Sequence, residues 1–409
     1  MRLSLNSHFE VSFITFIVLQ GMFFNFQFYF IGIAGANIAQ LFLISIFLFA
    51  IIIFAPKRKI FIPKSYFFLF FFYNIMILLC TIINVEYLTS ATGRTFFIYV
   101  FGFCVFMFFN LFDSHKLDGL FKALSFTLIL LGVAQFIIPE LLPLELRYVP
   151  SLVEPYRLDS FWLGGNVYYK PNGAVGNPIE FAVFCILSIL FILYRKESIG
   201  CFSIFDKTLL VTSFTAILFT LSRLGIALAL IVLIFYFMLS RRAFYKKIAL
   251  FSFLFLLIVL SFAFKDDFQL INAIWSRFDG SDELAKGSNL EHAKDYKAVV
   301  TLLLSSAFHF LLGYGVGYNN ANNVITDGLL FIIALDLGMI GLTLFSLLLT
   351  FPVLMVNNIT ALKYILLLLF VFYISSFVNS AFLNKTVYFS FMFIVSHIII
   401  RQKQPSLNG

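Results

Sequence analysis

Three separate arginines are the residues of this chain best suited to binding a charged group. Arg157 stands in PYRLDSFW, Arg223 in TLSRLG and Arg277 in IWSRFDG, each where an apolar segment meets a polar stretch. Arginine keeps its charge at physiological pH, and its planar fork of N–H donors matches phosphate oxygens. Three converging arginines would suit a diphosphate at a membrane surface. Headgroup anchoring, or a salt bridge to an acid such as Asp159, is the simpler alternative.

Two carboxylates could act as general bases beside such a group. Asp327 lies in NNVITDGLL, at the start of a predicted helix, where it could cap free amides or accept a proton from an incoming hydroxyl. Glu180 lies in GNPIEFA, just after Pro178 in the first turn of another predicted helix. We expect Asp327 to be the stronger candidate and Glu180 the weaker.

A second aspartate, Asp336, follows inside the same apolar segment as Asp327. Nine residues on an ideal helix make half a rotation and about 13.5 Å of rise, so the two carboxylates cannot share a face. We expect Asp336 to face the protein interior and make an interhelical hydrogen bond. Gly338 and Gly341 would let a neighbouring helix approach closely.

Further polar residues could contact a substrate. His292 lies in SNLEHAKDYKAV, typical of a short amphipathic helix, and Asn322 and Asn323 lie in the turn-like stretch GYGVGYNNANN. Solvent exposure alone would explain His292. The sequence contains no Walker loop, no HExxH and no Asp-x-Asp pair, so we expect no metal and no cofactor.

Composition indicates an integral membrane protein. Of the 409 residues 61% are hydrophobic and only 12% are charged, far from the values of soluble proteins. No polar block is long enough for a separate soluble domain, so we expect one all-α membrane domain over 1–409. The formal charge of +8 comes from basic residues in short connections, which excludes nucleic acid as the explanation.

Apolar runs of membrane-spanning length recur along the chain. They predict about twelve transmembrane helices, at 9–28, 35–55, 65–84, 94–113, 119–138, 178–195, 206–222, 224–240, 247–264, 325–350, 361–379 and 386–401. The stretch 206–242 is long for one span, and we expect a break at LSRLG, where Gly225 and its polar neighbours could turn the chain.

The basic connections PKRKIFIPK (56–64) and RRAFYKK (241–247) should be cytoplasmic, and both termini with them. Two larger loops, 139–177 and 265–324, then lie outside. Within the second, AVVTLLLSSAFHFLLGYG (298–315) is apolar but short, and we expect it to lie in the interface or re-enter rather than cross.

These motifs resemble, in order and placement, those of the bacterial O-antigen polymerase and ligase superfamily. TLSRLG is similar to its Ser-Arg-x-Gly element at an external helix end, and GYGVG followed by TDGLLFIIALDLGMIG is similar to its Gly-x-Gly turn and following helix. RLDSFW with GNPIEFA is similar to its first external loop. Asp327 stands where the ligases have a histidine, which favours the polymerases, and His292 stands where the family commonly has arginine.

The resemblance implies a GT-C-like, metal-independent glycosyltransferase of the bacterial inner (cytoplasmic) membrane that joins undecaprenyl-diphosphate-linked oligosaccharide units on the periplasmic side and inverts the anomeric configuration. It also implies contact with membrane lipids and a chain-length regulator protein as a partner. A flippase or exporter of the same lipid-linked saccharide, or an O-antigen ligase, is the alternative. Charges gathered in two outer loops, rather than along a central path, favour the polymerase.

Overall fold

The structure is a computed structural model of the chain. It describes residues 7–22, 62–83, 90–109, 117–138, 160–163, 166–200, 202–238, 283–322, 328–379 and 381–403, together with residue 324 and short pieces between 271 and 278.

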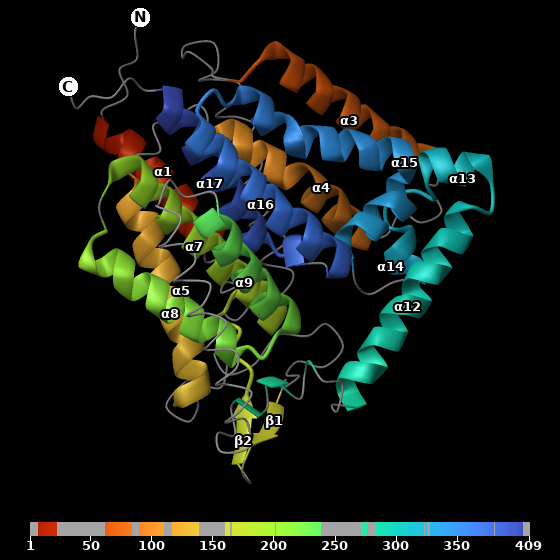
Figure 1. Ribbon diagram of the computed structural model, residues 1–409. Helices are drawn as coiled ribbons and strands as arrows, with labels where there is room; N and C mark the ends of the chain where they lie inside the picture. Colours follow the sequence, from red (N-terminus) through yellow and green to blue (C-terminus); the bar gives the residue numbers. More distant parts are fainter. Residues whose placement is uncertain are drawn as a thin grey trace, which may run out of the picture.

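Helices dominate these residues, and they pack into one bundle (Figure 1). The longer helices are α1 (Ser7–Met22), α3 (Lys64–Ile83), α4 (Ser90–Phe109), α5 (Asp118–Ile137), α7 (Pro178–Ile199), α8 (Ile204–Phe219), α9 (Arg223–Met238), α12 (Glu283–Leu303), α15 (Leu329–Thr350), α16 (Ile359–Val378) and α17 (Lys385–Lys403). The short elements are α13 (Ala307–Leu312), α14 (Tyr318–Asn322), the 3₁₀ helices η5 (Phe351–Met355) and η6 (Ala381–Leu383), and strands β1 (Ser160–Leu163) and β2 (Asn166–Tyr169).

Five helices are long and apolar enough to cross a membrane, which is consistent with a helical membrane protein. They cover Lys64–Ile82, Asp118–Ile137, Pro178–Ser198, Leu329–Met355 and Ile359–Val378. Ten of the twelve predicted segments contain a helix, namely α1, α3, α4, α5, α7, α8, α9, α15, α16 and α17. The other two, 35–55 and 247–264, lie outside the described residues.

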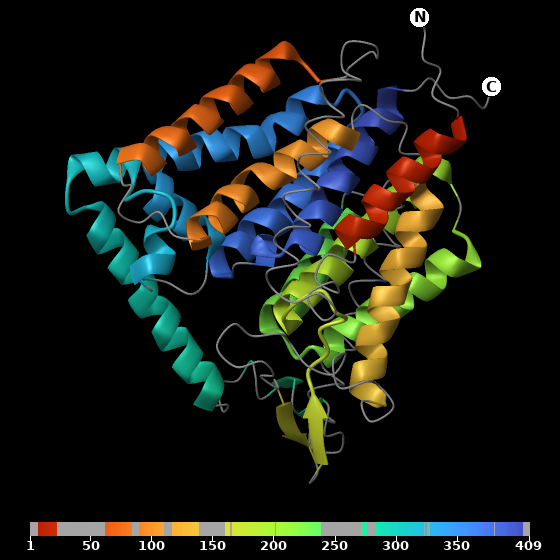
Figure 2. The same ribbon diagram turned by 180° about the vertical axis from the view of Figure 1, so that it is seen from behind.

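One feature departs from the predicted all-helical fold: β1 and β2 form an antiparallel hairpin within the predicted external loop 139–177. Leu163 pairs with Asn166, so a two-residue connection joins the strands, and the sequence there is Gly164-Gly165. Two glycines suit the tight turns of such hairpins, and the aromatic residues beside them favour strands. The hairpin projects from one end of the bundle (Figures 1 and 2).

Helices α7 and α17 form the centre of the bundle. Nearly every residue of α17 from Val387 to Ile400 is buried, and α17 contacts α1, α4, α7 and α16. Aromatic rings fill the space between the helices: Phe393 of α17 stacks on Phe121 of α5 at 4.6 Å and meets Phe109 of α4 edge-on at 4.9 Å. Much of the phenylalanine enrichment is therefore interior packing as well as lipid-facing surface.

Glycines allow this close packing, and Gly102 is one at which an added Cβ would have no room. A Cβ on Gly102 of α4 would overlap the ring of Tyr388 on α17, which is itself buried. We expect Gly102→Ala to destabilise the protein by about 3 kcal/mol, because an overpacked core must shift a ring held on all sides. Thermal unfolding in detergent measures the change.

Gly119→Ala is the matched control, since Gly119 is also helical and a Cβ there would meet nothing within 4 Å. It should leave stability unchanged or raise it by up to about 1 kcal/mol. Equal unfolding temperatures for the two variants would contradict the packing described for Gly102.

Ion pairs join several helix termini at one end of the bundle. Asp118, at the start of α5, accepts from Arg195 Nε at 2.9 Å and lies 3.2 Å from His397 Nδ1. Asp206, at the start of α8, accepts from Lys122 Nζ at 2.8 Å. The pairs connect the starts of α5 and α8 to the ends of α7 and α17.

The same end holds the start of α16 and the start of α3. Lys363 of α16 donates to Glu197 of α7 at 2.7 Å. The ring of Tyr66, in the first turn of α3, lies 5.2 Å from that of Phe351, which follows the last residue of α15. We call this the basic end.

Candidate functional site

The end opposite the basic end contains the described site residues that the sequence predicts. It is formed by the ends of α5, α8 and α16 and the starts of α7, α9, α15 and α17. Phe136 of α5 stacks on Phe219 of α8, and Phe331 of α15 lies 5.1 Å from Phe377 of α16. Several uncharged polar side chains are buried here, and we call it the polar end. They are Gln135, Asn172, Ser222, Asn379 and Asn384.

Glu180 is held by a capping box at the start of α7. Its Oε2 accepts from Asn177 N at 2.9 Å, and Asn177 Oδ1 accepts from Glu180 N at 2.9 Å. The same Oε2 accepts from Asn384 Nδ2 at 2.7 Å, which ties α7 to the start of α17. Gly176 must be glycine because a Cβ there would overlap the Glu180 carboxylate. Glu180 therefore has a structural role whatever else it does.

The chain that leads into α7 is anchored to the end of α5. Gln135 Oε1 accepts from Asn172 N and Gly173 N, each at 2.9 Å, and Gln135 Nε2 donates to Asn172 Oδ1 at 2.9 Å. These bonds satisfy buried amides in a segment where Gly173 and Ala174 both have positive φ, 58° and 57°. The end of the predicted loop 139–177 is thus part of the packed interior.

Arg223 lies at the tight turn between α8 and α9, and the predicted break at LSRLG is confirmed. Leu221 takes the left-handed conformation, with φ 51°. Ser222 Oγ accepts from Gly225 N at 3.1 Å, which caps α9. The predicted role of Gly225 in the turn is wrong: it lies inside α9, where a Cβ would press on Ala182 of α7. Arg223 is partly exposed as the first residue of α9.

These contacts bring Arg223 and Glu180 to the same part of the polar end. Gly225, two residues after Arg223, meets α7 at Ala182, two residues after Glu180. Arg223 and Glu180, from distant parts of the chain, therefore lie in the first turns of two helices, α9 and α7, that pack against each other at Gly225 and Ala182. A positive group beside helix N-termini is suited to binding an anion.

Helix α12 covers the other side of the polar end, as Figure 2 shows. Tyr296 of α12 stacks on Phe331 at the start of α15 at 4.5 Å, and its hydroxyl donates to Phe377 O at the end of α16 at 3.2 Å. A helix is present around His292, but it is longer than expected, because it extends from Glu283 to Leu303.

The apolar segment 298–315 does not cross the bundle. The segment contains the last residues of α12, up to Leu303, and then the short α13. Gly313, which follows α13, lies against Gly338, where α15 is broken with φ 66°. The segment thus reaches a point well inside α15 and turns back, while its position relative to a membrane stays a prediction. The close approach expected at Gly338 is present, but it is made to α13 through a break in α15 rather than between two regular helices.

Asp336 has the interior partner that the sequence could not identify. Its Oδ2 accepts from the Tyr99 hydroxyl of α4 at 3.0 Å, so the predicted interhelical hydrogen bond is present. Its side chain is fully buried, at 0% exposure.

The remaining predicted residues are distributed as follows. Asn322 is exposed in α14, and its Nδ2 donates to Tyr318 O at 3.1 Å. Gly328 occupies the cap position of α15 without a side-chain cap, so Asp327 precedes the cap residue. Four residues lie outside the described part of the chain: Arg157, Arg277, Asn323 and Asp327.

Sequence reasoning missed Asn384 and Lys385. Lys385, the first residue of α17, is only 5% exposed although it is cationic and lies at the polar end. The available signal was the pair Asn-Lys interrupting the apolar stretch SAFLNKTVYFSF, which the prediction treated as the edge of a span.

Asn384 allows a test of how the polar end is held together. Its Oδ1 accepts from Thr386 N at 3.0 Å, while its Nδ2 donates to Glu180 and to Val175 O. We expect Asn384→Ala to cost about 2–4 kcal/mol, because it removes a helix cap and the partner of a part-buried carboxylate. Thermal unfolding in detergent measures the loss.

Asn358→Ala is the control for capping alone. Asn358 caps α16 by accepting from Thr360 N at 2.8 Å, in an exposed position. That variant should lose only about 1 kcal/mol. A loss for Asn384→Ala no larger than this would mean that its bonds to α7 contribute nothing.

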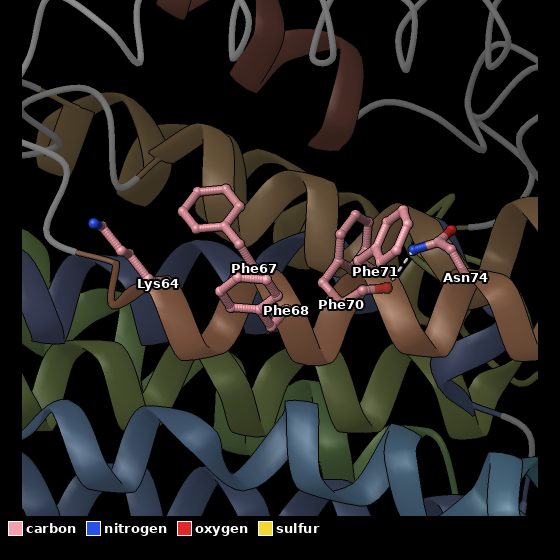
Figure 3. A pocket seen from close by; sticks show the side chains of 6 residues that line it. All are labelled: Lys64, Phe67, Phe68, Phe70, Phe71 and Asn74. Atoms are coloured by element: carbon pink, nitrogen blue, oxygen red, sulfur yellow. Dashed lines mark hydrogen bonds between the residues drawn. The ribbon is translucent and has the colours of Figure 1, made fainter.

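A groove on α3 lies elsewhere and has a different character (Figure 3). Its polar atoms are few: Asn74 Nδ2 already donates to Phe70 O at 2.7 Å, and Lys64 stands at the rim. Phe68 is 63% exposed, as expected for a helix facing lipid tails. The groove is lined by Lys64, Phe67, Phe68, Phe70, Phe71 and Asn74. Its aromatic lining suits an apolar chain better than a saccharide.

The chemistry open to the polar end is electrostatic. Within the described residues, no group of three or more His, Cys, Asp or Glu is placed to hold a metal ion. A cation at Arg223 beside helix N-termini can stabilise negative charge, and a carboxylate can accept a proton. No model of a known protein family matches the chain, and no curated protein matches it either.

Proposed function

We propose that this protein is a membrane glycosyltransferase that joins undecaprenyl-diphosphate-linked oligosaccharide units into a surface polysaccharide such as O-antigen. The single observation that carries the proposal is the placement of Arg223 after a tight turn, at the start of a helix that packs on the beginning of α7, at the end away from the basic one. A cation there suits a diphosphate at the membrane surface.

The basic end is the cytoplasmic side in this proposal, by the positive-inside rule. Lys122, Arg195, Lys363 and Arg401 all take part in ion pairs there. The polar end then faces the periplasm of a bacterial inner membrane. The full chain has about twelve spans with both termini cytoplasmic, in a GT-C-like arrangement.

In the reaction, a hydroxyl of the acceptor unit attacks the anomeric carbon of the donor chain. The new glycosidic C–O bond forms as the C–O bond to the diphosphate breaks, with inversion at that carbon. Asp327 accepts the hydroxyl proton, and the leaving undecaprenyl diphosphate keeps the electron pair. Arg157, Arg223 and Arg277 stabilise its charge. His292, Asn322 and Asn323 contact the saccharide, and a chain-length regulator is the expected protein partner.

Export of the same lipid-linked saccharide is the competing function, and one observation weighs against it. A transporter of a polar substrate needs charged groups along a central path. The buried carboxylate of Asp336 instead meets donors of its own chain, Tyr99 OH and the amides of Gly317 and Asn319.

The test uses the purified protein in liposomes with the lipid-linked repeat unit of its host. We expect a ladder of products that differ by one repeat unit, together with released undecaprenyl diphosphate. Movement of a fluorescent lipid-linked oligosaccharide across the bilayer without any ladder would identify an exporter and contradict the proposal. A single transfer of preformed polymer to a lipid core would identify a ligase.

A further inference from the structure

The carboxylate of Asp336 holds the glycine-rich segment 313–322 as well as α4. Asp336 Oδ2 accepts from Gly317 N at 3.2 Å, and Oδ1 accepts from Asn319 N at 3.4 Å. Gly317 has φ 96°, a conformation that glycine adopts readily. Two amides of one loop therefore point at a single side chain that lies inside the bundle.

Backbone bonds add to this attachment. The break at Gly338 frees carbonyls in the turn of α15 that precedes it, because their usual partners lie beyond the break. Tyr314 N donates to Leu335 O at 2.8 Å, and Gly315 N donates to Asp336 O at 3.0 Å. The loop supplies the donors that α15 lacks, and Asp336 contributes both its carbonyl and its carboxylate.

This attachment lies well inside α15, away from its first residue. Asp336 is seven residues after Leu329, which is about 10.5 Å along the helix axis. From this depth the chain returns through α14 to Gly328, at the start of α15. Asp327 therefore lies, in the sequence, between two positions that the structure describes, Asn322 of α14 and Gly328 at the cap of α15.

We propose that Asp336 is a positioning residue: it fixes the glycine-rich segment 313–322, which leads in the sequence to the proposed base, Asp327. Asp336 touches no substrate. Its consequence for turnover rests on the proposed function, whereas its hold on the segment does not. Since Asp327 acts in the bond-forming step, loss of the attachment lowers kcat and leaves KM nearly unchanged.

Variants of Asp336 and Tyr99 distinguish this positioning role from a simple hydrogen bond between α15 and α4. In Asp336→Asn, the side-chain amide can still bond the Tyr99 hydroxyl, which donates or accepts, but its NH₂ cannot accept from a loop amide. In Tyr99→Phe, both loop amides keep their acceptors and only the bond to α4 is lost. If Asp336 positions the segment, Asp336→Asn should lower kcat more than Tyr99→Phe does. If Asp336 only joins two helices, Tyr99→Phe should lower kcat more.

The reporter is Val316→Cys, because Val316 is buried in the middle of the segment, at 2% exposure. We expect an impermeant maleimide to label it about tenfold faster in Asp336→Asn than in the Asp336 background, and at an unchanged rate in Tyr99→Phe. Val183→Cys on α7 is the control for global unfolding, since Val183 is fully buried. Matched variants without an added cysteine give the background from native thiols.

Hydrogen exchange tests the attachment in the unmodified protein. The amides of Tyr314, Gly315 and Gly317 should exchange as slowly as those of α15. Fast exchange there, or unchanged labelling of Val316→Cys in Asp336→Asn, would overturn the attachment. Faster labelling with an unchanged kcat would overturn the positioning role alone. Absence of turnover in the parent protein would overturn the proposed function and leave the labelling result intact.

Discussion

Replacing Arg223 by alanine is expected to reduce polymer formation by about 10²- to 10³-fold, because it removes a preorganised cation that stabilises the departing diphosphate. The structure predicts that the variant still folds. Leu221 and Ser222 form the turn before α9, and the Ser222 hydroxyl caps its first turn. The Arg223 side chain is partly exposed.

Arg223→Lys should be intermediate. Lysine keeps the charge but loses the planar fork that binds two phosphate oxygens at once, so we expect a loss of about tenfold. The rate of ladder formation in liposomes gives the turnover, and gel analysis of the surface polysaccharide gives the result in the host.

Lys297→Ala is the matched control for Arg223. Lys297 is an exposed cation on α12, at the same end of the bundle. It should change the rate by less than about twofold, because an exposed cation outside the proposed diphosphate site contributes little. A normal ladder of long chains from well-expressed Arg223→Ala would remove Arg223 from the proposed site.

Asp327→Asn is expected to lower turnover by about 10²- to 10⁴-fold with little effect on stability. Asparagine caps a helix as well as aspartate does, so a capping role alone would leave the variant fully active. The cap position of α15 is taken by Gly328, with φ 90° and no side-chain cap, which weakens the capping interpretation. Initial rates and unfolding temperatures of the same preparation distinguish the two roles.

Glu180→Gln provides the comparison, because Glu180 is the other candidate base. Its Oε2 already accepts from Asn177 N and Asn384 Nδ2, and glutamine is also found at this position of a capping box. We expect this variant to lose some stability and keep most of its turnover. If instead Glu180→Gln were inactive and Asp327→Asn active, the base would be Glu180.

Local sequence signals predicted the helices and some of their limits correctly. The break at LSRLG followed from the length of the apolar stretch, and α8 and α9 do end and begin there. The first turn of α7 followed from Pro178 and Glu180, and the structure adds Asn177, whose side chain completes a capping box with Glu180. Such features depend on residues only three or four positions apart, so the sequence contains all the information they need.

Contacts between distant residues could not be predicted in the same way. Nothing near Asp336 in the chain indicates Tyr99, which is 237 positions away, and nothing near Glu180 indicates Asn384, which is 204 positions away. The role assigned to Gly225 was wrong for the same reason, since its neighbour Ala182 belongs to another helix.

The sequence by itself determined the helical membrane character of this protein, the start of α7, the break between α8 and α9, and the residue types able to bind a phosphate. Hydrophobic run length and capping chemistry are local properties, and they suffice for these. Only the tertiary structure decided which polar groups share the interior: Asp336 with Tyr99 and the glycine-rich segment 313–322, and Glu180 with Asn384. Those pairings depend on how the helices pack, because a buried polar group must find its partner on whichever element lies beside it.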